Sequence, residues 1–232
     1  MFVPWAEFRY AAGMTKEQPG TGARRSPRSG GCPNETRQKL ITAATGVFAE
    51  HGFRGASVRE IADAVGMTFP LVTYHFGSKE NLWLAVAEKA LAEIVELSQG
   101  FSIPDDCDPT ERMQAYFRLV LLDSTRHPDR RRILAQISAR NDKDATKPLA
   151  PLLADFQSSS TLRIQRLIDL GFPTRLSAQD IQMVLRGLLA SNASAPLGPA
   201  NLFGFRSNKA LVDYQVQLMM RLCLDAEAKP ES

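Results

Sequence analysis

Residues 57–76 read SVREIADAVGMTFPLVTYHF, and this stretch decides the fold of the N-terminal part of the chain. Two short helices are expected here, one beginning after Ser57 and one after Thr68, with Gly66 in the turn between them. A tight turn between helices needs a residue that accepts positive φ, and glycine does so without a Cβ clash. Ala62 lies four residues before that glycine, where only a small side chain lets the helices approach closely. The spacing predicts a helix-turn-helix, whose second helix can enter the major groove of DNA.

The residues around this pair mark further helix ends. Ser57 and Glu60 form the pattern of a capping box, and Pro70 suits the first turn of the second helix, where a missing N–H costs nothing. An apolar stripe over residues 40–48 predicts a preceding helix that Gly52 ends. Ser78 is expected to cap a following helix that runs to about residue 97. The expected core positions of the pair are Ile61, Val65, Met67, Val72 and Phe76.

The rest of the chain also has the helical period. Helices are expected at about 109–126, 129–141, 147–170, 177–192 and 208–226, separated by proline and glycine. No alternating pattern typical of a strand is present in the sequence. The expected fold is all-α, with a three-helix head and a C-terminal helical bundle, about nine helices in total.

Composition excludes several classes of protein. The chain has 232 residues, of which 44% are hydrophobic and 23% charged, as is usual for globular proteins. No apolar stretch is long enough for a membrane span, and Glu7 and Arg9 interrupt any apolar segment of a signal peptide. Cys32, Cys107 and Cys223 are far apart and odd in number, which fits a reducing cytoplasm better than a disulfide framework.

The net charge of +3 has an uneven distribution. Residues 1–34 hold five basic and two acidic residues, whereas the remaining chain holds 23 of each. Residues 13–34 are rich in Gly, Pro, Ser and charge, so residues 1–34 are expected to be a disordered basic arm. The arm is compatible with nucleic-acid binding, but a solvated tail that only aids solubility fits equally. The expected domains are a helix-turn-helix head at 35–82 and a ligand-binding and dimerisation domain at 83–232.

A longer stretch of the head carries a family pattern. Residues 43–83 read AATGVFAEHGFRGASVREIADAVGMTFPLVTYHFGSKENLW. From Thr36 to about Ala87 the sequence resembles the tetracycline-repressor-like (TetR/AcrR) family of bacterial transcription regulators. The pattern is matched in the first helix, before the turn glycine and at the start of the fourth helix, by Ala44, Phe48, Gly52, Phe53, Ile61, Ala62, Gly66, His75, Phe76 and Lys79. One departure is Val72-Thr73, where many members have Leu-Tyr, so that the tyrosine falls one residue later, at Tyr74.

The resemblance implies a DNA-reading surface. Hydroxyls at helix N-termini suit phosphate oxygens, an arginine can bond the O6 and N7 atoms of guanine, and apolar side chains can contact thymine methyls. Arg59 is the candidate for guanine, Phe69 and Leu71 are those for thymine, and Tyr74 and Lys79 are phosphate candidates. The complete predicted DNA-binding set is Ser57, Arg59, Thr68, Phe69, Pro70, Leu71, Thr73, Tyr74, His75 and Lys79.

Three members of this set have competing interpretations. Arg59 could pair with Asp63 four residues on, as an ordinary exposed arginine of a helix. Phe69 could be a core residue, and His75 could cap a helix end instead of contacting phosphate or sugar.

The resemblance also implies a homodimer and a small-molecule effector. The helices at about 177–192 and 208–226 would pair with their copies, and two-fold symmetry would favour a palindromic operator. Their apolar residues are Ile181, Val184, Leu185, Leu188 and Leu189, and Leu211, Val212, Val216, Leu218, Met219 and Leu222. The predicted pocket is lined by Met113, Tyr116, Phe117, Val120, Leu121, Ile137, Phe156 and Gln165. A solid core at these positions is the alternative; if a pocket exists, a largely apolar or aromatic effector fits it.

No pattern in the sequence supports catalysis. The three histidines are not spaced with other ligands as a zinc site requires, and no P-loop, G-x-S-x-G or G-x-G-x-x-G motif is present. No enzyme activity, metal or cofactor is expected, and Arg130, Arg131 and Arg132 are interpreted as a solvated helix face. The sequence predicts a ligand-responsive repressor that binds double-stranded DNA. A helical ligand-binding or protein-interaction module that does not use its helix-turn-helix is the alternative.

Overall fold

The computed structural model describes residues 33–101, 107–139, 147–194 and 198–224. These residues form ten α-helices and one short 3₁₀ helix, η2 (Lys147–Leu149), and contain no strand. The α-helices are α1 (Pro33–Gly55), α2 (Val58–Ala64), α3 (Phe69–Phe76), α4 (Lys79–Gln99), α5 (Pro109–Arg126), α6 (Pro128–Ala139), α8 (Ala150–Asp169), α9 (Ala178–Ala193), α10 (Pro199–Leu202) and α11 (Asn208–Leu224). The all-α class expected from the sequence is confirmed.

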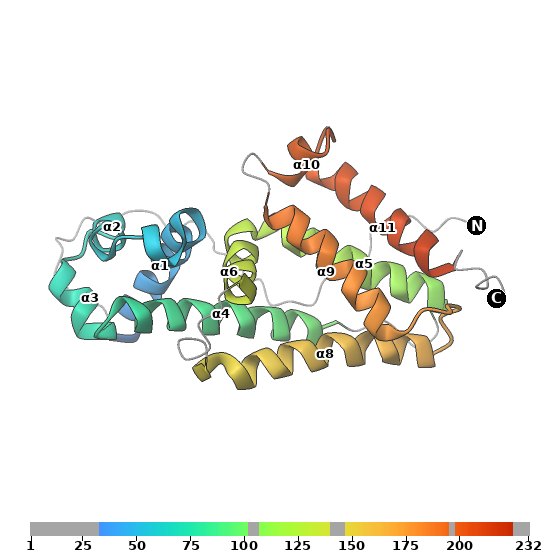
Figure 1. Ribbon diagram of the computed structural model, residues 1–232, viewed down its shortest axis with the longest axis horizontal. Helices are drawn as coiled ribbons and strands as arrows, with labels where there is room; N and C mark the ends of the chain where they lie inside the picture. Colours follow the sequence, from blue (N-terminus) through green and yellow to red (C-terminus); the bar gives the residue numbers. More distant parts are fainter. Residues whose placement is uncertain (1–32, 102–106, 140–146, 195–197, 225–232) are drawn as a thin grey trace, which may run out of the picture.

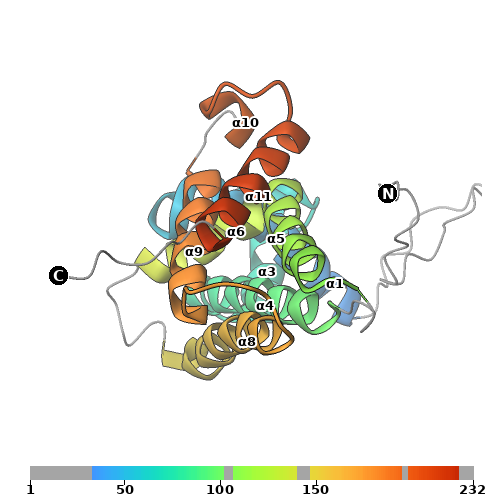
Figure 2. The ribbon, with the colours of Figure 1, turned by 90° about the vertical axis from the view of Figure 1, so that its right-hand side faces the viewer.

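The helices form an elongated molecule with a small end and a large end (Figure 1). At the small end α1, α2 and α3 gather around the beginning of α4. At the large end α5, α8, α9 and α11 pack together, and Figure 2 shows them as a bundle seen end-on. The long helix α4 runs from one end toward the other, and α6 lies between them in contact with α1, α4 and α9.

Two apolar cores hold these parts together. The first core joins α1–α4 to residues of α6, so that Ile133 and Ile137 pack with the head helices. The second core lies among α5, α8, α9 and α11 and includes Met113, Phe117 and Val216. The domain boundary expected between residues 82 and 83 falls inside α4, which crosses that point without interruption. The helix α6 therefore packs against both the head and the body.

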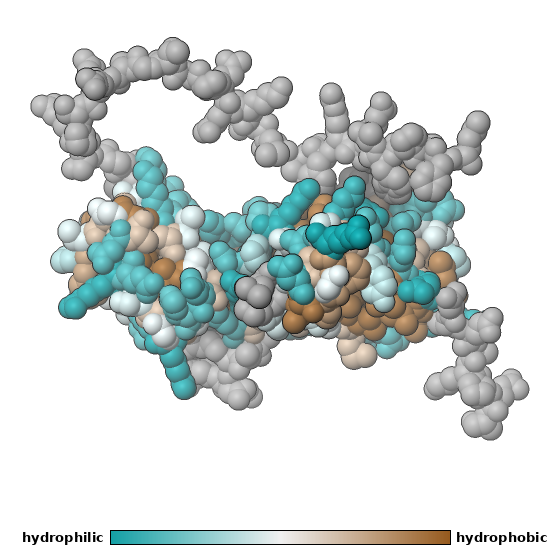
Figure 3. Space-filling model, turned by 90° about the horizontal axis from the view of Figure 1, so that it is seen from above, coloured by the Kyte–Doolittle hydropathy of each residue, from teal (hydrophilic) through white to brown (hydrophobic). Residues whose placement is uncertain are grey.

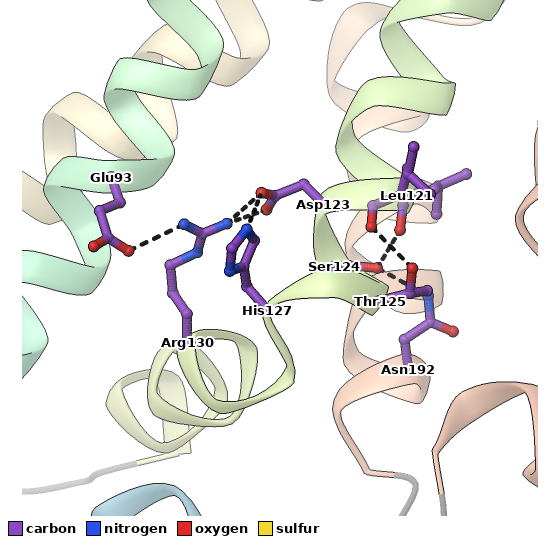
Figure 4. Close-up of polar contacts among 9 residues, drawn as sticks. Glu93, Leu121, Asp123, Ser124, Thr125, His127, Arg130 and Asn192 are labelled. Carbon is purple, nitrogen blue, oxygen red and sulfur yellow. Dashed lines mark hydrogen bonds and ion pairs between the residues drawn. The ribbon is translucent and has the colours of Figure 1, made fainter. Parts of the chain in front are cut away.

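Arg130 ties the start of α6 to two neighbouring helices (Figure 4). Its Nη1 donates to Oε2 of Glu93 on α4 at 3.0 Å, and its Nη2 donates to both carboxylate oxygens of Asp123 on α5. The side chains of Arg130 and Asp123 are 11% and 10% exposed, so water screens this pair little. His127 lies 3.8 Å from the same carboxylate. The interpretation of residues 130–132 as a solvated face is wrong for Arg130, and also for Arg131, which is buried, because α6 packs across α4 and α5 there.

A group of three hydrogen-bonded polar side chains is buried in the second core. Asn192 donates to Oγ of Ser124 at 3.2 Å and exchanges amide hydrogen bonds with Gln215 at 3.0 and 3.3 Å. All three side chains are buried; Asn192 lies on α9, Ser124 on α5 and Gln215 on α11 (the first two are drawn in Figure 4). The reciprocal amide pair joins α9 to α11, and the hydrogen bond from Asn192 to Ser124 adds α5, so the three polar groups favour one relative position of these helices.

Several helix ends differ from expectation. Gly52 has φ of 68° and breaks the helical geometry as predicted, but the helix resumes and continues to Gly55. Ser57 is the N-cap of α2, yet its side chain makes no capping bond, and Glu60 lies 3.2 Å from Nε2 of His51 instead. The predicted capping box is therefore wrong, because an ion-pairing partner on α1 is available. The short α10 was not expected, since its segment begins at a run of prolines and glycine.

The reactivity of Cys223 offers a test of the packing of the second core. Its side chain is buried, and burial raises the pKa of the thiol to about 11. Because the thiolate is the nucleophile, only about one thiol in a thousand would be reactive at pH 8. In a variant with Cys32 and Cys107 changed to serine, we expect no reaction with Ellman's reagent until denaturant is added. Rapid reaction of the folded chain would contradict the packing of α11.

Within the described ranges, no helix combines the length and apolarity needed to cross a bilayer.

Candidate nucleic-acid interface

The helix-turn-helix is formed as the sequence predicts. Gly66 has φ of 65°, the left-handed conformation that favours glycine, and its N–H donates to the carbonyl of Asp63 at 3.1 Å. Met67 N–H donates to the carbonyl of Ala62 at 2.9 Å, which closes the end of α2. Ala62 is buried with Ile61, Val72 and Phe76 in the head core, and Val65 and Met67 pack against it. The core predicted for this pair is therefore confirmed.

Gly66 offers a direct test of the turn. A Cβ at this position would meet no atom within 4 Å, so alanine would be disfavoured by backbone conformation alone. We expect Gly66→Ala to lower the free energy of unfolding by about 1–2 kcal/mol, and Gly66→Asn to lower it less. Gly46 also has open space around it but lies inside α1, so Gly46→Ala should stabilise by about 0.5–1 kcal/mol. Urea unfolding of the three variants measures this, and equal effects at both glycines would contradict the turn geometry.

The outer face of α3 is apolar and aromatic but exposed. Tyr74 is 82% exposed and Phe69 is 46% exposed, so Phe69 is not a core residue. Thr73 is exposed, with its hydroxyl donating to the Phe69 carbonyl at 3.2 Å, and Leu71 is half-buried. Pro70 lies in the first turn, as expected. The helix contains no carboxylate that would repel phosphate.

Arg59 projects from α2 toward this face. Its guanidinium carbon lies 5.9 Å from the centre of the Phe69 ring, and the side chain is exposed. No ion pair with Asp63 is present in the part of the chain that the structure describes, so the competing interpretation of Arg59 is not realised. A guanidinium held over an aromatic ring keeps its N–H edge free for an acceptor.

Two hydroxyls lie at the starts of the paired helices. Ser57 is the N-cap of α2 and Thr68 the N-cap of α3, both are exposed, and neither side chain makes a capping hydrogen bond. The first backbone N–H groups of a helix and a free hydroxyl form a favourable environment for a phosphate oxygen.

The side chains of Lys79 and His75 make contacts within the chain. The Nζ of Lys79 donates to the Arg54 carbonyl at 3.4 Å and sits 5.0 Å from the centre of the Phe53 ring. Lys79 therefore closes the end of α1 in this structure, and its phosphate contact remains a prediction. His75 is half-buried, with its ring 5.4 Å from that of Tyr74.

Two supporting residues are absent from the predicted set. Asn81 donates to the Phe76 carbonyl at 2.9 Å and so closes the end of α3 from the first turn of α4. Arg37 on α1 places its guanidinium carbon 5.2 Å from the centre of the Phe76 ring. The contact between Asn81 and Phe76 spans only five residues, so the sequence could have predicted it from an asparagine that follows the turn at Gly77. The contact between Arg37 and Phe76 joins distant segments and leaves no sign in the sequence.

The residues predicted to line a ligand pocket fall into two groups. Met113, Tyr116, Phe117 and Leu121 are fully buried in the second core, and Val120 packs against it. Ile137 and Phe156 instead belong to the first core, and Gln165 is exposed and donates to Asp169. Burial raises the pKa of Tyr116 to about 12, so its hydroxyl stays neutral. The structure does not bring these eight side chains to a single cluster.

Among the described residues no three His, Cys, Asp or Glu side chains are grouped so that they could hold a metal ion.

Comparison with known proteins places the head in a family. Residues 40–86 match the family described as bacterial regulatory proteins, tetR family. The HTH-type transcriptional repressor AcnR of Corynebacterium glutamicum is 40% identical over 72 residues, which are 31% of this chain. The match spans 38% of the length of AcnR, so this chain is aligned with less than half of that relative.

Solved structures extend the likeness to the whole fold. A tetR-family regulatory protein from Rhodococcus RHA1 superposes with a TM-score of 0.67 at 17% identity, over 82% of this chain and 97% of that one. FadR from Bacillus subtilis, solved in complex with stearoyl-CoA, gives a TM-score of 0.60 at 13% identity, over 79% and 97%. At these identities the likeness concerns the fold, including the helical body beyond the matched head. The head of the chain is therefore similar to that of the tetR family of bacterial regulatory proteins, and the described fold is similar to that of a solved tetR-family protein.

Proposed function

We propose that this chain is a ligand-responsive transcriptional regulator that binds a palindromic DNA operator as a homodimer. In this proposal residues 35–82 read DNA, and residues 83–232 bind the effector and form the dimer. The protein represses transcription while it is bound to the operator, and the small-molecule effector releases it. The proposed place of action is the bacterial cytoplasm, and no catalytic activity is proposed. The observation that carries the DNA-binding proposal is the exposed face of α3 with Arg59 beside it.

That face has the chemistry to read base pairs. Phe69 and Leu71 offer apolar surface to thymine methyls, and Arg59 offers two parallel N–H groups to a guanine edge. Ser57, Thr68, Thr73 and Tyr74 surround them with hydroxyl groups suited to phosphate oxygens. Phe69 and Tyr74 are both exposed on this one short helix, and exposed apolar side chains that are grouped together are typical of a contact surface.

Dimer formation is proposed through α9 and α11, and of the side chains taken from the sequence only Leu222 is exposed. Ile181, Leu185 and Val216 are buried in the chain's own core and are not available to a partner. The exposed apolar side chains of this region are Met183, Leu202, Phe203, Tyr214, Leu222 and Leu224. Figure 3 shows apolar surface gathered on the half of the molecule that holds these helices. Such a patch is typical of an interaction surface.

Effector binding is proposed for the bundle of α5, α8, α9 and α11. The neighbour FadR was solved in complex with stearoyl-CoA, so a fold of this kind can bind a ligand that carries a long apolar acyl chain. The apolar side chains of the second core, with Tyr116 as a neutral polar group among them, favour a largely apolar effector here.

Selection of bound sequences from random duplex DNA tests the proposed function. The expected result is enrichment of a palindrome with half-sites about one helical turn apart or somewhat more. Enrichment should be lost with Phe69→Glu and kept with Arg175→Ala, a change at an exposed residue far from α3 in the sequence. No enriched sequence, together with an intact fold, would favour the protein-interaction module instead.

A further inference from the structure

A surface groove lies between α1, α4 and the beginning of α8. Its volume is about 360 Å³, and its floor is formed by Ile41, Ala85, Ala92 and Leu152. Both α1 and α8 pack against α4, and Figure 1 shows α8 running along it. The groove is separate from the exposed face of α3 and from the second core. It is large enough to receive an aromatic side chain, since it is comparable to the smaller ligand sites of proteins.

Charged groups border the apolar floor. Arg37 and Lys89 contribute cations, and Glu88 contributes an exposed carboxylate. The Nζ of Lys89 lies 3.3 Å from Oγ1 of Thr42 and 3.9 Å from a carboxylate oxygen of Glu93. Glu88 makes no ion pair with any residue in the described ranges. An apolar floor with both signs of charge at its border suits a short peptide that carries an aromatic residue and both signs of charge.

We propose that this groove is the docking site of the chain's own N-terminal segment, residues 1–12. That segment reads MFVPWAEFRYAA and contains four aromatic residues, Phe2, Trp5, Phe8 and Tyr10. It also carries one acid, Glu7, which matches the two cations, and one base, Arg9, which matches Glu88. The proposal concerns this segment alone and holds whether or not the chain binds DNA.

The segment is attached close to the groove. The described part begins at Pro33, and Arg37 and Ile41 lie four and eight residues further along the same helix. At 1.5 Å per residue, the groove therefore begins within about 6–12 Å of the point where the arm joins α1. Residues 13–32 supply a linker of 20 residues rich in Gly, Ser and Pro. A flexible chain of 20 residues would span about 25 Å on average, which is longer than the distance from Pro33 to the groove, so the length of this segment allows residues 1–12 to reach it.

Because residues 1–12 belong to the same chain as the groove, even weak binding would keep the groove occupied most of the time. A short linker gives an effective concentration of about 1 mM. A segment that binds as a free peptide with a Kd of about 0.1 mM would then occupy the groove about 90% of the time. The groove joins α1 of the head to α4 and α8, so an occupied groove would brace the head against the body.

The two tryptophans of the chain allow a direct test. Trp83 is buried and Trp5 lies in the proposed segment, so 5-fluorotryptophan labelling gives two fluorine resonances that Trp5→Phe assigns. In the full chain we expect the Trp5 resonance to be shifted from that of a free peptide of residues 1–14. The exposed fraction of Trp5, measured by its solvent-isotope shift, should be about tenfold smaller than in the peptide.

A pair of matched substitutions locates the contact. Ala92→Arg fills the groove and should return the Trp5 resonance to the position of the free peptide. Ala154→Arg, the same change at an exposed position of α8, should leave it unmoved. The Trp83 resonance verifies the fold, and Glu88→Arg replaces Ala92→Arg if that resonance moves.

Three results would overturn the proposal. The first is a Trp5 resonance identical in the full chain and the peptide. The second is a shifted resonance that the groove substitution does not change, because the segment would then dock elsewhere. The third is an equal response to Ala92→Arg and Ala154→Arg, which would indicate a nonspecific association.

Discussion

Replacing Arg59 with alanine is expected to lower operator affinity by about 5- to 150-fold. This range corresponds to the roughly 1–3 kcal/mol that a bidentate arginine–guanine contact contributes. The guanidinium lies over the Phe69 ring with no ion pair to Asp63, so its removal leaves no buried carboxylate and should not affect folding. Affinity is measured by fluorescence anisotropy on the selected operator, at a stated salt concentration because phosphate contacts make binding salt-dependent.

Two further variants separate base reading from charge. Arg59→Lys keeps the charge but cannot form two parallel hydrogen bonds, so it should bind the operator nearly as weakly as the alanine variant. Arg175→Ala removes the same charge from the body and should change affinity little. If Arg59→Lys instead bound like the unmodified chain, Arg59 would be a phosphate contact and would not read a base.

Replacing Gly187 with arginine is expected to convert the proposed dimer to a monomer. Gly187 is exposed on α9, one helical turn beyond Met183, and a Cβ there would meet no atom within 4 Å of the same chain. In a two-fold dimer through α9 and α11, the two copies of the new side chain would face each other across a close helix contact. Juxtaposed like charges cost several kcal/mol, which corresponds to a loss of dimer affinity of at least about 100-fold.

Light scattering at micromolar concentration measures the mass, and circular dichroism checks that helix content is kept. Gly46→Arg is the matched control, since Gly46 also lies inside a helix with open space around it. It should remain dimeric. A Gly187→Arg chain of dimeric mass would place the interface away from α9.

Local signals in the sequence determine the fold of the head. The turn needs a left-handed backbone that Gly66 accepts, and Ala62 leaves room for a crossing helix. Pro70 fits a helix only in its first turn. Each constraint acts within a few residues, so the positions of the head helices follow from the amino-acid sequence alone. The expected order of helices in the body follows in the same way from apolar period and from proline and glycine stops.

Tertiary packing decides what local patterns leave open. Glu60 had a local partner in Ser57 but lies 3.2 Å from Nε2 of His51, which the packing of α1 against α2 brings near. Arg130 looked solvated, yet α4 and α5 supply two carboxylates. An apolar stripe in the sequence predicts that one face of a helix is buried, but it does not indicate which other helix covers that face. Ile181 and Leu185 therefore pack within one chain, and Met183 on the same helix stays exposed.

The same limit applies to the proposed sites. The exposure of Phe69 and the position of Arg59 above it depend on how α2 and α3 cross, which is a matter of three-dimensional distance. The groove beside Arg37 exists only because α1, α4 and α8 meet there. Short-range backbone preferences thus determine the helices of this protein and its turn at Gly66. Which side chains remain exposed on its surface depends on contacts between residues that are far apart in the chain. Local backbone preferences do not specify these contacts.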